Sequence, residues 1–180
     1  MNHVERISRE LSYKGAIVDF YTDTMRLPDG KIEKWDLVHH RRGAACVIPV
    51  LDDGRILMIR QFRPALDRMT LEPPAGARDS ETEDTRICAI RELREETGYD
   101  AKSVELLIKL RPTVAYCDEF IDVYVATGLT KVGEQILDEA EAIEIEAFTM
   151  DELLDKIFNY EIQDSKAVSA ILAYKVKYLR

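Results

Sequence analysis

Apolar residues along the chain form strand-like segments in the first half and helix-like segments later, which predicts an α/β protein. Residues 15–26 and 31–39 lie on either side of the sequence LPDG, whose proline, aspartate and glycine favour a turn. They predict an antiparallel hairpin. Residues 43–52 and 55–62 are nearly continuous apolar runs around a second Asp-Gly pair, as expected for buried strands. The core sheet is therefore expected to begin at residue 43.

Prolines and a glycine interrupt the pattern between residues 64 and 80, so this segment is predicted to be a loop. Ser80 and Glu83 then have the spacing of a capping box, and Gly98 is typical of a left-handed helix end. These signals predict a helix over about 81–97.

Within this helix, Ile87, Ile90 and Leu93 fall on one side and are expected to pack on the sheet. The rest of the chain predicts three strands followed by two helices. The strands are expected over 103–111, 119–126 and 143–149, and the helices near 150–158 and 164–178.

Three glutamates, Glu92, Glu95 and Glu96, gather on a different side of the same helix. Like charges at this spacing repel, by about 0.2–0.5 kcal/mol per pair. A solvated acidic face is one interpretation, but the last turns of a helix favour cations rather than acids. Backbone carbonyls of the preceding loop would complete an all-oxygen site for a hard cation. The pattern therefore favours a divalent-cation site.

Composition restricts the possible partners. The chain has 180 residues, of which 46% are hydrophobic, enough for one domain and a small extension. A formal charge of −9 argues against a nucleic-acid or anionic-membrane partner. No stretch has the length of a membrane span or the pattern of a signal peptide, and the three cysteines lack C-x-x-C spacing. A cytoplasmic protein with reduced thiols is expected.

The sequence from Gly76 to Tyr99, GARDSETEDTRICAIRELREETGY, resembles the Nudix box, GX5EX7REUXEEXGU, in which U is a bulky apolar residue. It departs from that pattern by one additional residue between Gly76 and Glu83. The positions in register with the box are Glu83, Arg91, Glu92, Leu93, Glu95, Glu96, Gly98 and Tyr99.

Segments outside the box, such as IRQFRPALDRMTLEPPAGA, are similar to the ADP-ribose pyrophosphatase branch of the Nudix hydrolases. This resemblance implies a Nudix α/β/α sandwich with a mixed β-sheet and an N-terminal antiparallel β-hairpin extension. Residues 1–42 would be the extension, which commonly takes part in a homodimer, and residues 43–180 would be the Nudix hydrolase domain.

The resemblance also implies an activity: hydrolysis of the pyrophosphate bond of a nucleoside diphosphate-linked substrate, foremost ADP-ribose to AMP and ribose 5-phosphate. The implied cofactor is Mg²⁺, with Mn²⁺ as the other candidate. By resemblance, the metal ligands are Glu92, Glu96, Glu95 and the backbone carbonyl of Ala75. Arg91 would orient these glutamates through ion pairs.

The catalytic base is implied to come from the acidic loop LDEAEA, which points to Glu139, with Glu141 as the second candidate. Without the resemblance, this loop would be interpreted as solvated charge. The catalytic group implied by the resemblance thus consists of Glu139, Glu141, Arg91 and Glu95.

Five positions are implied to bind the substrate: Trp35, Arg42, Arg63, Ala77 and Glu119. The arginines match residues that contact the nucleotide and its phosphates, and Glu119 matches an acid near the terminal ribose. Trp35 matches an aromatic residue that stacks on adenine across a dimer. Structural alternatives are an interface tryptophan and arginines paired with neighbouring acids. His39 and His40 lack metal-ligand spacing and are interpreted as strand residues.

Val114 and Ala115 stand where this branch usually has Pro-Gly, which leaves the substrate open among ADP-ribose, GDP-mannose, other nucleotide sugars and dinucleotides. A catalytically silent Nudix module that binds a nucleotide is the alternative to an enzyme. Such a module would be expected to lack metal-binding glutamates or to carry a DNA-binding domain, and the sequence shows neither feature.

Overall fold

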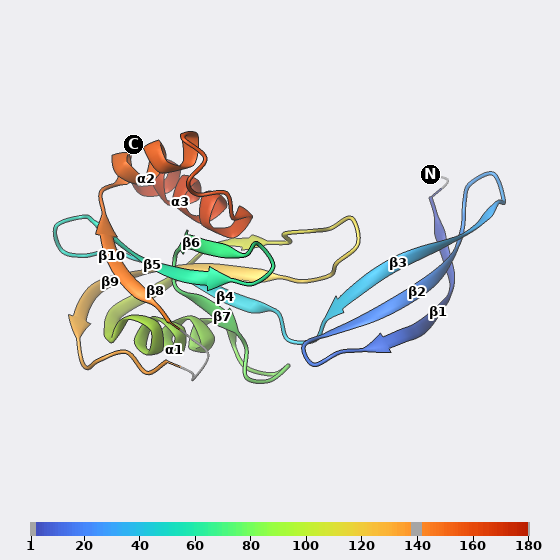
Figure 1. The fold of residues 1–180 in the computed structure, drawn as a ribbon, viewed down its shortest axis with the longest axis horizontal. Coiled ribbons are helices and arrows are strands. Elements are labelled where there is room, and N and C mark those ends of the chain that lie inside the picture. Colours follow the sequence, from blue (N-terminus) through green and yellow to red (C-terminus); the bar gives the residue numbers. More distant parts are fainter. Residues whose placement is uncertain (1–2, 138–141, 180) are drawn as a thin grey trace.

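The structure is a computed structural model that describes residues 3–137 and 142–179 (Figure 1). The strands and helices expected from the sequence occur in the expected order, together with three strands that were not expected. The strands are β1 (Glu5–Lys14), β2 (Val18–Arg26), β3 (Ile32–His40), β4 (Ala44–Pro49), β5 (Ile56–Arg63), β6 (Arg68–Glu72), β7 (Ala75–Ala77), β8 (Tyr99–Leu110), β9 (Ile121–Lys131) and β10 (Glu144–Phe148). The helices are α1 (Thr85–Thr97), α2 (Met150–Phe158) and α3 (Ser165–Tyr178). No helix among the described residues is long and apolar enough to cross a membrane.

Strands β1–β3 form a separate antiparallel sheet, called here the N-terminal sheet, which projects away from the other elements (Figure 1). The predicted hairpin is confirmed, since β2 pairs with β3 from Val18 opposite His40 to Arg26 opposite Ile32. Strand β1 was not expected, because its charged and polar residues carry no buried apolar face. All ten of its residues are exposed, so pairing with β2 rather than burial defines it.

The core is an α/β/α sandwich, as the resemblance implied. Its mixed sheet has the strand order β7-β4-β9-β8, with β4 and β9 parallel, and a second antiparallel sheet has the order β10-β5-β6. Figure 1 shows α1 on one side of these sheets and α2 with α3 on the other. Alternate residues of β4 serve the two layers: Ala45 and Val47 pack with α1, whereas Cys46 and Ile48 pack with the α2–α3 side.

Three predicted boundaries were wrong. The segment 64–80 contains strands β6 and β7, which pair with β5 and β4 respectively, so tertiary partners override its turn-rich composition. Helix α1 is capped by Asp84, whose side chain accepts a hydrogen bond from the Arg86 N–H, and not by Ser80. Strand β8 begins at Tyr99, directly after Gly98, whose φ of 73° ends the helix as predicted.

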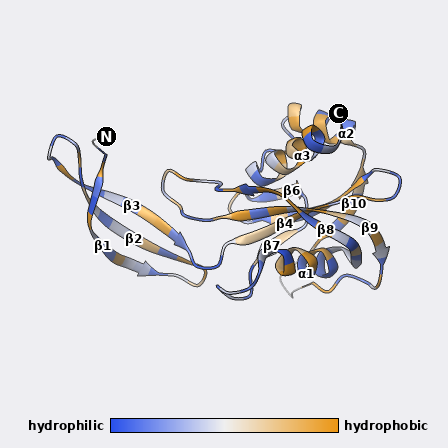
Figure 2. Ribbon diagram, turned by 180° about the vertical axis from the view of Figure 1, so that it is seen from behind, coloured by the Kyte–Doolittle hydropathy of each residue, from blue (hydrophilic) through white to orange (hydrophobic). Residues whose placement is uncertain are grey.

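The predicted packing face of α1 was also wrong in part. Leu93 is fully buried, but Ile87 is 58% exposed. The residues of α1 that pack on the sheet beside Leu93 are Cys88 and Ala89, both fully buried. Their small side chains let the helix lie close to β4 and β9, so size decides the contact face here. Figure 2 shows hydrophobic residues on β3 as well as on the core strands, and Ile32 and Trp35 of β3 are 50% and 43% exposed.

Candidate active site

The C-terminal half of α1 brings its glutamates against β7. Glu92 and Glu96 are 9% and 3% exposed, although both are acids, whereas the Glu95 side chain is 39% exposed. The Ala75 N–H donates a hydrogen bond of 2.9 Å to Glu96 Oε2. At Gly76, a Cβ atom would overlap the Glu92 carboxylate, so only glycine permits this approach.

Arg91 lies among these acids and joins them. Its Nη1 donates to Glu92 Oε1 at 2.5 Å and to Glu95 Oε2 at 3.1 Å, and its Nε lies 3.4 Å from Glu83 Oε1. Its Nη2 also donates to the Ala77 carbonyl at 3.0 Å. Burial would lower the pKa of Arg91, but the hydrogen bond with Glu83 and the charge of Glu92 outweigh it and raise the pKa. The guanidinium is therefore a permanent cation.

We call the group of Glu83, Glu92, Glu95 and Glu96 around Arg91 the acidic cluster. The carboxylate oxygens of the acidic cluster and the nearby backbone carbonyl of Ala75 are the kind of ligand that a hard divalent cation prefers. The absence of a Cβ at Gly76 lets the Glu92 carboxylate lie directly against β7, the strand that carries the Ala75 carbonyl group. Within the described ranges, however, no three acidic, histidine or cysteine side chains converge as a ready-made metal site. Arg91 holds Glu92 and Glu95, so a cation would have to share these carboxylates with it.

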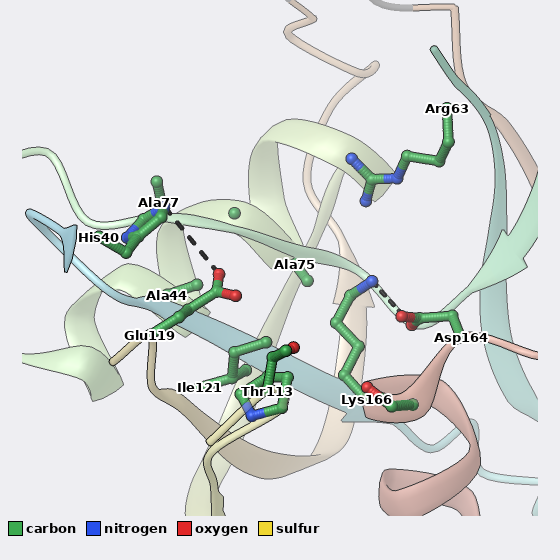
Figure 3. Close-up of a pocket in the computed structure, with 13 residues that line it drawn as sticks. His40, Ala44, Arg63, Ala75, Ala77, Thr113, Glu119, Ile121, Asp164 and Lys166 are labelled. Carbon is green, nitrogen blue, oxygen red and sulfur yellow. Dashed lines mark hydrogen bonds and ion pairs between the residues drawn. The ribbon is translucent and has the colours of Figure 1, made fainter. Parts of the chain in front are cut away.

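A cavity of about 430 Å³ lies on the other side of β7, whose residues Ala75–Ala77 form part of its wall (Figure 3). Two further predicted substrate residues, Arg63 and Glu119, line the same cavity. They come from β5 and from the segment before β9. The fold thus brings together four of the predicted site residues, which are Arg63, Ala75, Ala77 and Glu119.

A compact group of charges closes the end of the cavity where Arg63 lies. Glu72 is 1% exposed and accepts two hydrogen bonds from Arg63, at 2.8 and 2.6 Å, and one from Thr70 at 2.6 Å. Lys166 donates to Glu72 and, at 2.8 Å, to Asp164. We call Arg63, Glu72, Asp164 and Lys166 the balanced cluster, because it contains two cations and two acids.

Glu72 shows what these contacts do to a buried acid. Burial alone would raise its pKa, but Arg63, Lys166 and Thr70 outweigh burial and lower the pKa to about 2 from an ordinary value of 4.5. Glu72 is therefore ionised throughout the physiological range, and it holds the guanidinium of Arg63 by its Nε and Nη2 edge.

Other predicted residues lie elsewhere. Arg42 lines a neighbouring cavity, also of about 430 Å³, to which Ala77 contributes as well. Trp35 lies on β3 in the N-terminal sheet, 43% exposed, with its Nε1 3.3 Å from Glu33 Oε2. Glu139 and Glu141 lie outside the described residues, so their predicted role as base stays a prediction.

The cavity is also lined by three ionisable residues that were not predicted from the sequence: His40, Asp164 and Lys166. The N-cap signal at Asp164 was available, since its side chain accepts from the Ala167 N–H at 3.1 Å. Nothing local, however, indicates that Lys166 reaches Glu72, which is 94 positions away. His40 was interpreted as a strand residue, yet it also faces Glu119 across the cavity.

Comparisons with known proteins agree with this architecture. Residues 39–170 match the NUDIX domain family. The chain is 38% identical over 166 residues to the methanol dehydrogenase activator of Bacillus methanolicus, covering 92% of this chain and 89% of that one. It is 35% identical over 175 residues to the ADP-ribose pyrophosphatase of Bacillus subtilis (strain 168), covering 97% and 91%.

A solved structure described as an ADP compounds hydrolase has the same fold. It superposes with a TM-score of 0.86 over 96% of this chain and 92% of that chain, at 20% sequence identity. Nudix hydrolases generally use divalent metal ions, which is in keeping with the oxygen-rich acidic cluster. The family match over most of the chain, the relatives and the fold together show that this protein belongs to the NUDIX family and is a Nudix hydrolase similar to the ADP-ribose pyrophosphatases.

Proposed function

We propose that this protein hydrolyses the pyrophosphate bond of ADP-ribose, giving AMP and ribose 5-phosphate, with Mg²⁺ as cofactor and Mn²⁺ as a possible substitute. The observation that carries the proposal is the position of β7. Its backbone lines the cavity on one side and contacts Glu92, Glu96 and Arg91 of the acidic cluster. A pyrophosphate in the cavity would therefore lie next to the carboxylates.

The residues divide the work by their chemistry. Glu92 and Glu96, with Glu95 and the Ala75 carbonyl, are the proposed metal ligands, and Arg91 holds two of these carboxylates in place. When bound, a divalent cation neutralises phosphate charge and lowers the pKa of a coordinated water. Glu139, with Glu141 as the second candidate, is the proposed base that accepts the proton of the attacking water.

Four of the other residues are proposed to hold the substrate. Arg63 keeps its Nη1 edge free of Glu72, which leaves donors for a phosphate oxygen. Arg42 and Ala77 line the adjoining cavity, where the nucleotide portion would extend. Glu119 at the far end of the main cavity suits the hydroxyl groups of the second ribose.

We further propose that residues 1–42 form a dimerisation unit and residues 43–180 the hydrolase domain. The N-terminal sheet supports this because its burial is inverted. Asp19 and Asp23 are buried, with ion pairs to Arg41 and Arg9, while several large apolar side chains, distributed over both faces of the sheet, are exposed. These exposed side chains are Ile7, Leu11, Tyr13, Val18, Phe20, Ile32 and Trp35. Apolar groups in this number on one small sheet favour an interface with a second copy.

Trp35 is proposed to stack on the adenine of the substrate bound by the partner copy. Trp35→Ala should weaken binding of AMP measured by calorimetry. Tyr160→Ala, which removes an aromatic side chain that is 75% exposed just after α2, is the control. Unchanged affinity would return Trp35 to a purely structural role.

The dimer has a separate test: a monomeric mass in sedimentation equilibrium would reject it. We also propose that the protein is located in the cytoplasm.

The test of the activity is release of nucleoside monophosphate from ADP-ribose, ADP-glucose, GDP-mannose, NADH and a diadenosine polyphosphate, each with Mg²⁺ and with chelator. Selective, chelator-sensitive turnover of ADP-ribose is expected. Preference for GDP-mannose or another nucleotide sugar would keep the mechanism and reject the substrate. Binding without turnover of any compound would favour a silent Nudix module.

The relative from Bacillus methanolicus supports a second candidate function. Its name assigns it to activation of a dehydrogenase, and the identity of 38% spans nearly the whole chain. Many dehydrogenases bind dinucleotides that contain a pyrophosphate. In this alternative, the protein would act on a dinucleotide held by a dehydrogenase. Turnover of NADH that requires an added alcohol dehydrogenase would favour it over free ADP-ribose as substrate.

A further inference from the structure

His40 and Glu119 face each other at the end of the cavity away from Arg63 and Lys166 (Figure 3). His40 Nε2 lies 3.9 Å from Glu119 Oε1. Their side chains are 13% and 28% exposed, so both are largely enclosed. The proposed reaction assigns no role to this histidine.

The hydrogen bonding of His40 fixes which ring nitrogen carries a proton in the neutral imidazole. The Gly43 N–H donates to His40 Nδ1 at 3.0 Å. A backbone N–H can only donate, so Nδ1 must offer its lone pair. The proton of the imidazole therefore resides on Nε2, the nitrogen nearest to Glu119. His40 presents a hydrogen-bond donor to the cavity.

Glu119 is held opposite this donor through its neighbour Asp118. The Asp118 carboxylate bonds His39 Nδ1 at 2.7 Å and accepts from the His40 N–H at 2.9 Å. Asp118 N–H in turn donates to the Val38 carbonyl at 3.2 Å. The segment before β9 is thus tied to the end of β3, and these bonds set the separation of His40 from Glu119.

A separation of 3.9 Å is too long for a direct hydrogen bond. One oxygen about 2.8 Å from both atoms would bridge them. That oxygen must accept a hydrogen bond from Nε2–H and donate one to the carboxylate. A hydroxyl group or a water molecule does both, whereas an ionised phosphate oxygen cannot donate and is repelled by Glu119. Among the oxygen groups of a nucleotide sugar, the pair therefore selects a neutral hydroxyl.

We propose that His40 is a specificity-determining residue that, together with Glu119, binds a sugar hydroxyl of the group attached to the nucleoside diphosphate. This inference rests on the proposed function, which supplies such a sugar. It gives a role to the tautomer that the Gly43 N–H selects: in the other tautomer both Nε2 and Glu119 would be acceptors, and a hydroxyl could donate to only one of them.

The test is a binding cycle that does not depend on turnover. Calorimetry in the presence of chelator compares ADP-ribose with an analogue whose second sugar has hydrogen in place of its hydroxyls. If another nucleoside diphosphate sugar binds more tightly than ADP-ribose, that compound and its own analogue without sugar hydroxyls are compared instead. The wild type should prefer the hydroxylated ligand by about tenfold, the usual scale of one hydrogen bond. His40→Phe should abolish most of this preference while binding the analogue as the wild type does.

His40→Gln, which can keep an N–H near the Nε2 position, should retain part of the preference. Absence of a preference in the wild type, or an equal loss for both ligands in His40→Phe, would overturn the proposal. If His40→Phe does not fold, ¹⁵N spectra of the wild-type protein test the proposal by locating the proton of the neutral His40 imidazole. A proton on Nδ1 instead of Nε2 would overturn the proposal. His40-dependent preference without hydrolysis would uphold this inference and reject the proposed activity. Hydrolysis by the wild type, together with an unchanged preference for the hydroxylated ligand in His40→Phe, would uphold the proposed activity and overturn this inference.

Discussion

The acidic cluster and the balanced cluster lie near the same short strand but handle negative charge in opposite ways. In the balanced cluster, buried Glu72 has Arg63, Lys166 and Thr70 as partners. In the acidic cluster, Glu83, Glu92 and Glu95 all pair with the guanidinium of Arg91, and the Ala75 N–H donates to Glu96.

This difference separates two uses of a buried acid. A network whose charges balance needs no bound ion, and it holds together the elements that it joins, which here are β5, β6 and the start of α3. A network with excess negative charge carries a repulsion that a bound cation relieves. Burial alone therefore does not distinguish the two clusters. The ratio of acidic to cationic side chains does: four to one in the acidic cluster and two to two in the balanced cluster.

The largest expected effect is on catalysis in the acidic cluster. Glu96→Gln keeps the shape of the side chain but removes a charge from a proposed metal ligand. Activity measured as nucleoside monophosphate release should fall by more than the 10- to 100-fold typical of outer metal partners. Glu134→Gln, at a side chain that is 94% exposed, is the control and should be silent. Near-normal activity of Glu96→Gln would remove it from the metal site.

The next effect is on stability in the balanced cluster. Glu72→Gln leaves the Arg63 and Lys166 cations facing each other with too little negative charge, so the free energy of unfolding should fall by about 3–5 kcal/mol. Urea denaturation measures it. Glu146→Gln breaks the exposed pair with Arg60 and should cost less than about 1 kcal/mol. Equal losses in the two variants would contradict the distinction between the clusters.

The same residue predicts a pH dependence of stability. The pKa of Glu72 is lowered to about 2 in the folded protein from an ordinary 4.5. The folded state thus binds fewer protons than the unfolded state in this interval. Its stabilising contribution should be complete above pH 4.5 and should be lost as the pH falls toward 2. Unfolding curves at several pH values should show a smaller acid-dependent loss in Glu72→Gln than in the wild type.

A smaller effect is expected from crowding the acidic cluster. Gly76→Ala places a Cβ atom where the Glu92 carboxylate lies, so the carboxylate or β7 must shift. Activity should fall by about tenfold or more, since such shifts in position are costly to catalysis. Gly133→Ala, where a Cβ meets nothing within 4 Å, is the matched control. Full activity in Gly76→Ala would show that the close contact with Glu92 is dispensable.

The sequence predicted α1 well at its C-terminal end and poorly on its surface. Gly98 ended the helix where its left-handed backbone requires glycine. The apolar wheel, however, counted Ile87 as buried, and it is exposed. Periodicity identifies the side with more apolar residues, but a close approach to β4 favours the small side chains of Cys88 and Ala89.

What the sequence by itself determined is local. Hydrophobic runs, turn residues and the spacing from Gly76 to Tyr99 fixed the order of most elements, the family and the glutamates of α1. These signals depend on neighbours within a few residues, where helical and strand periods apply.

Only the tertiary structure decided the cavity and its two ends. Lys166 reaches Glu72 across 94 positions, and the Asp118–Glu119 segment meets His39 and His40 across nearly 80. Such pairs form because strand order and helix packing bring remote segments together. No local pattern of apolar and polar residues encodes that placement, so the partners that set the charge of each buried acid emerge only in the folded chain.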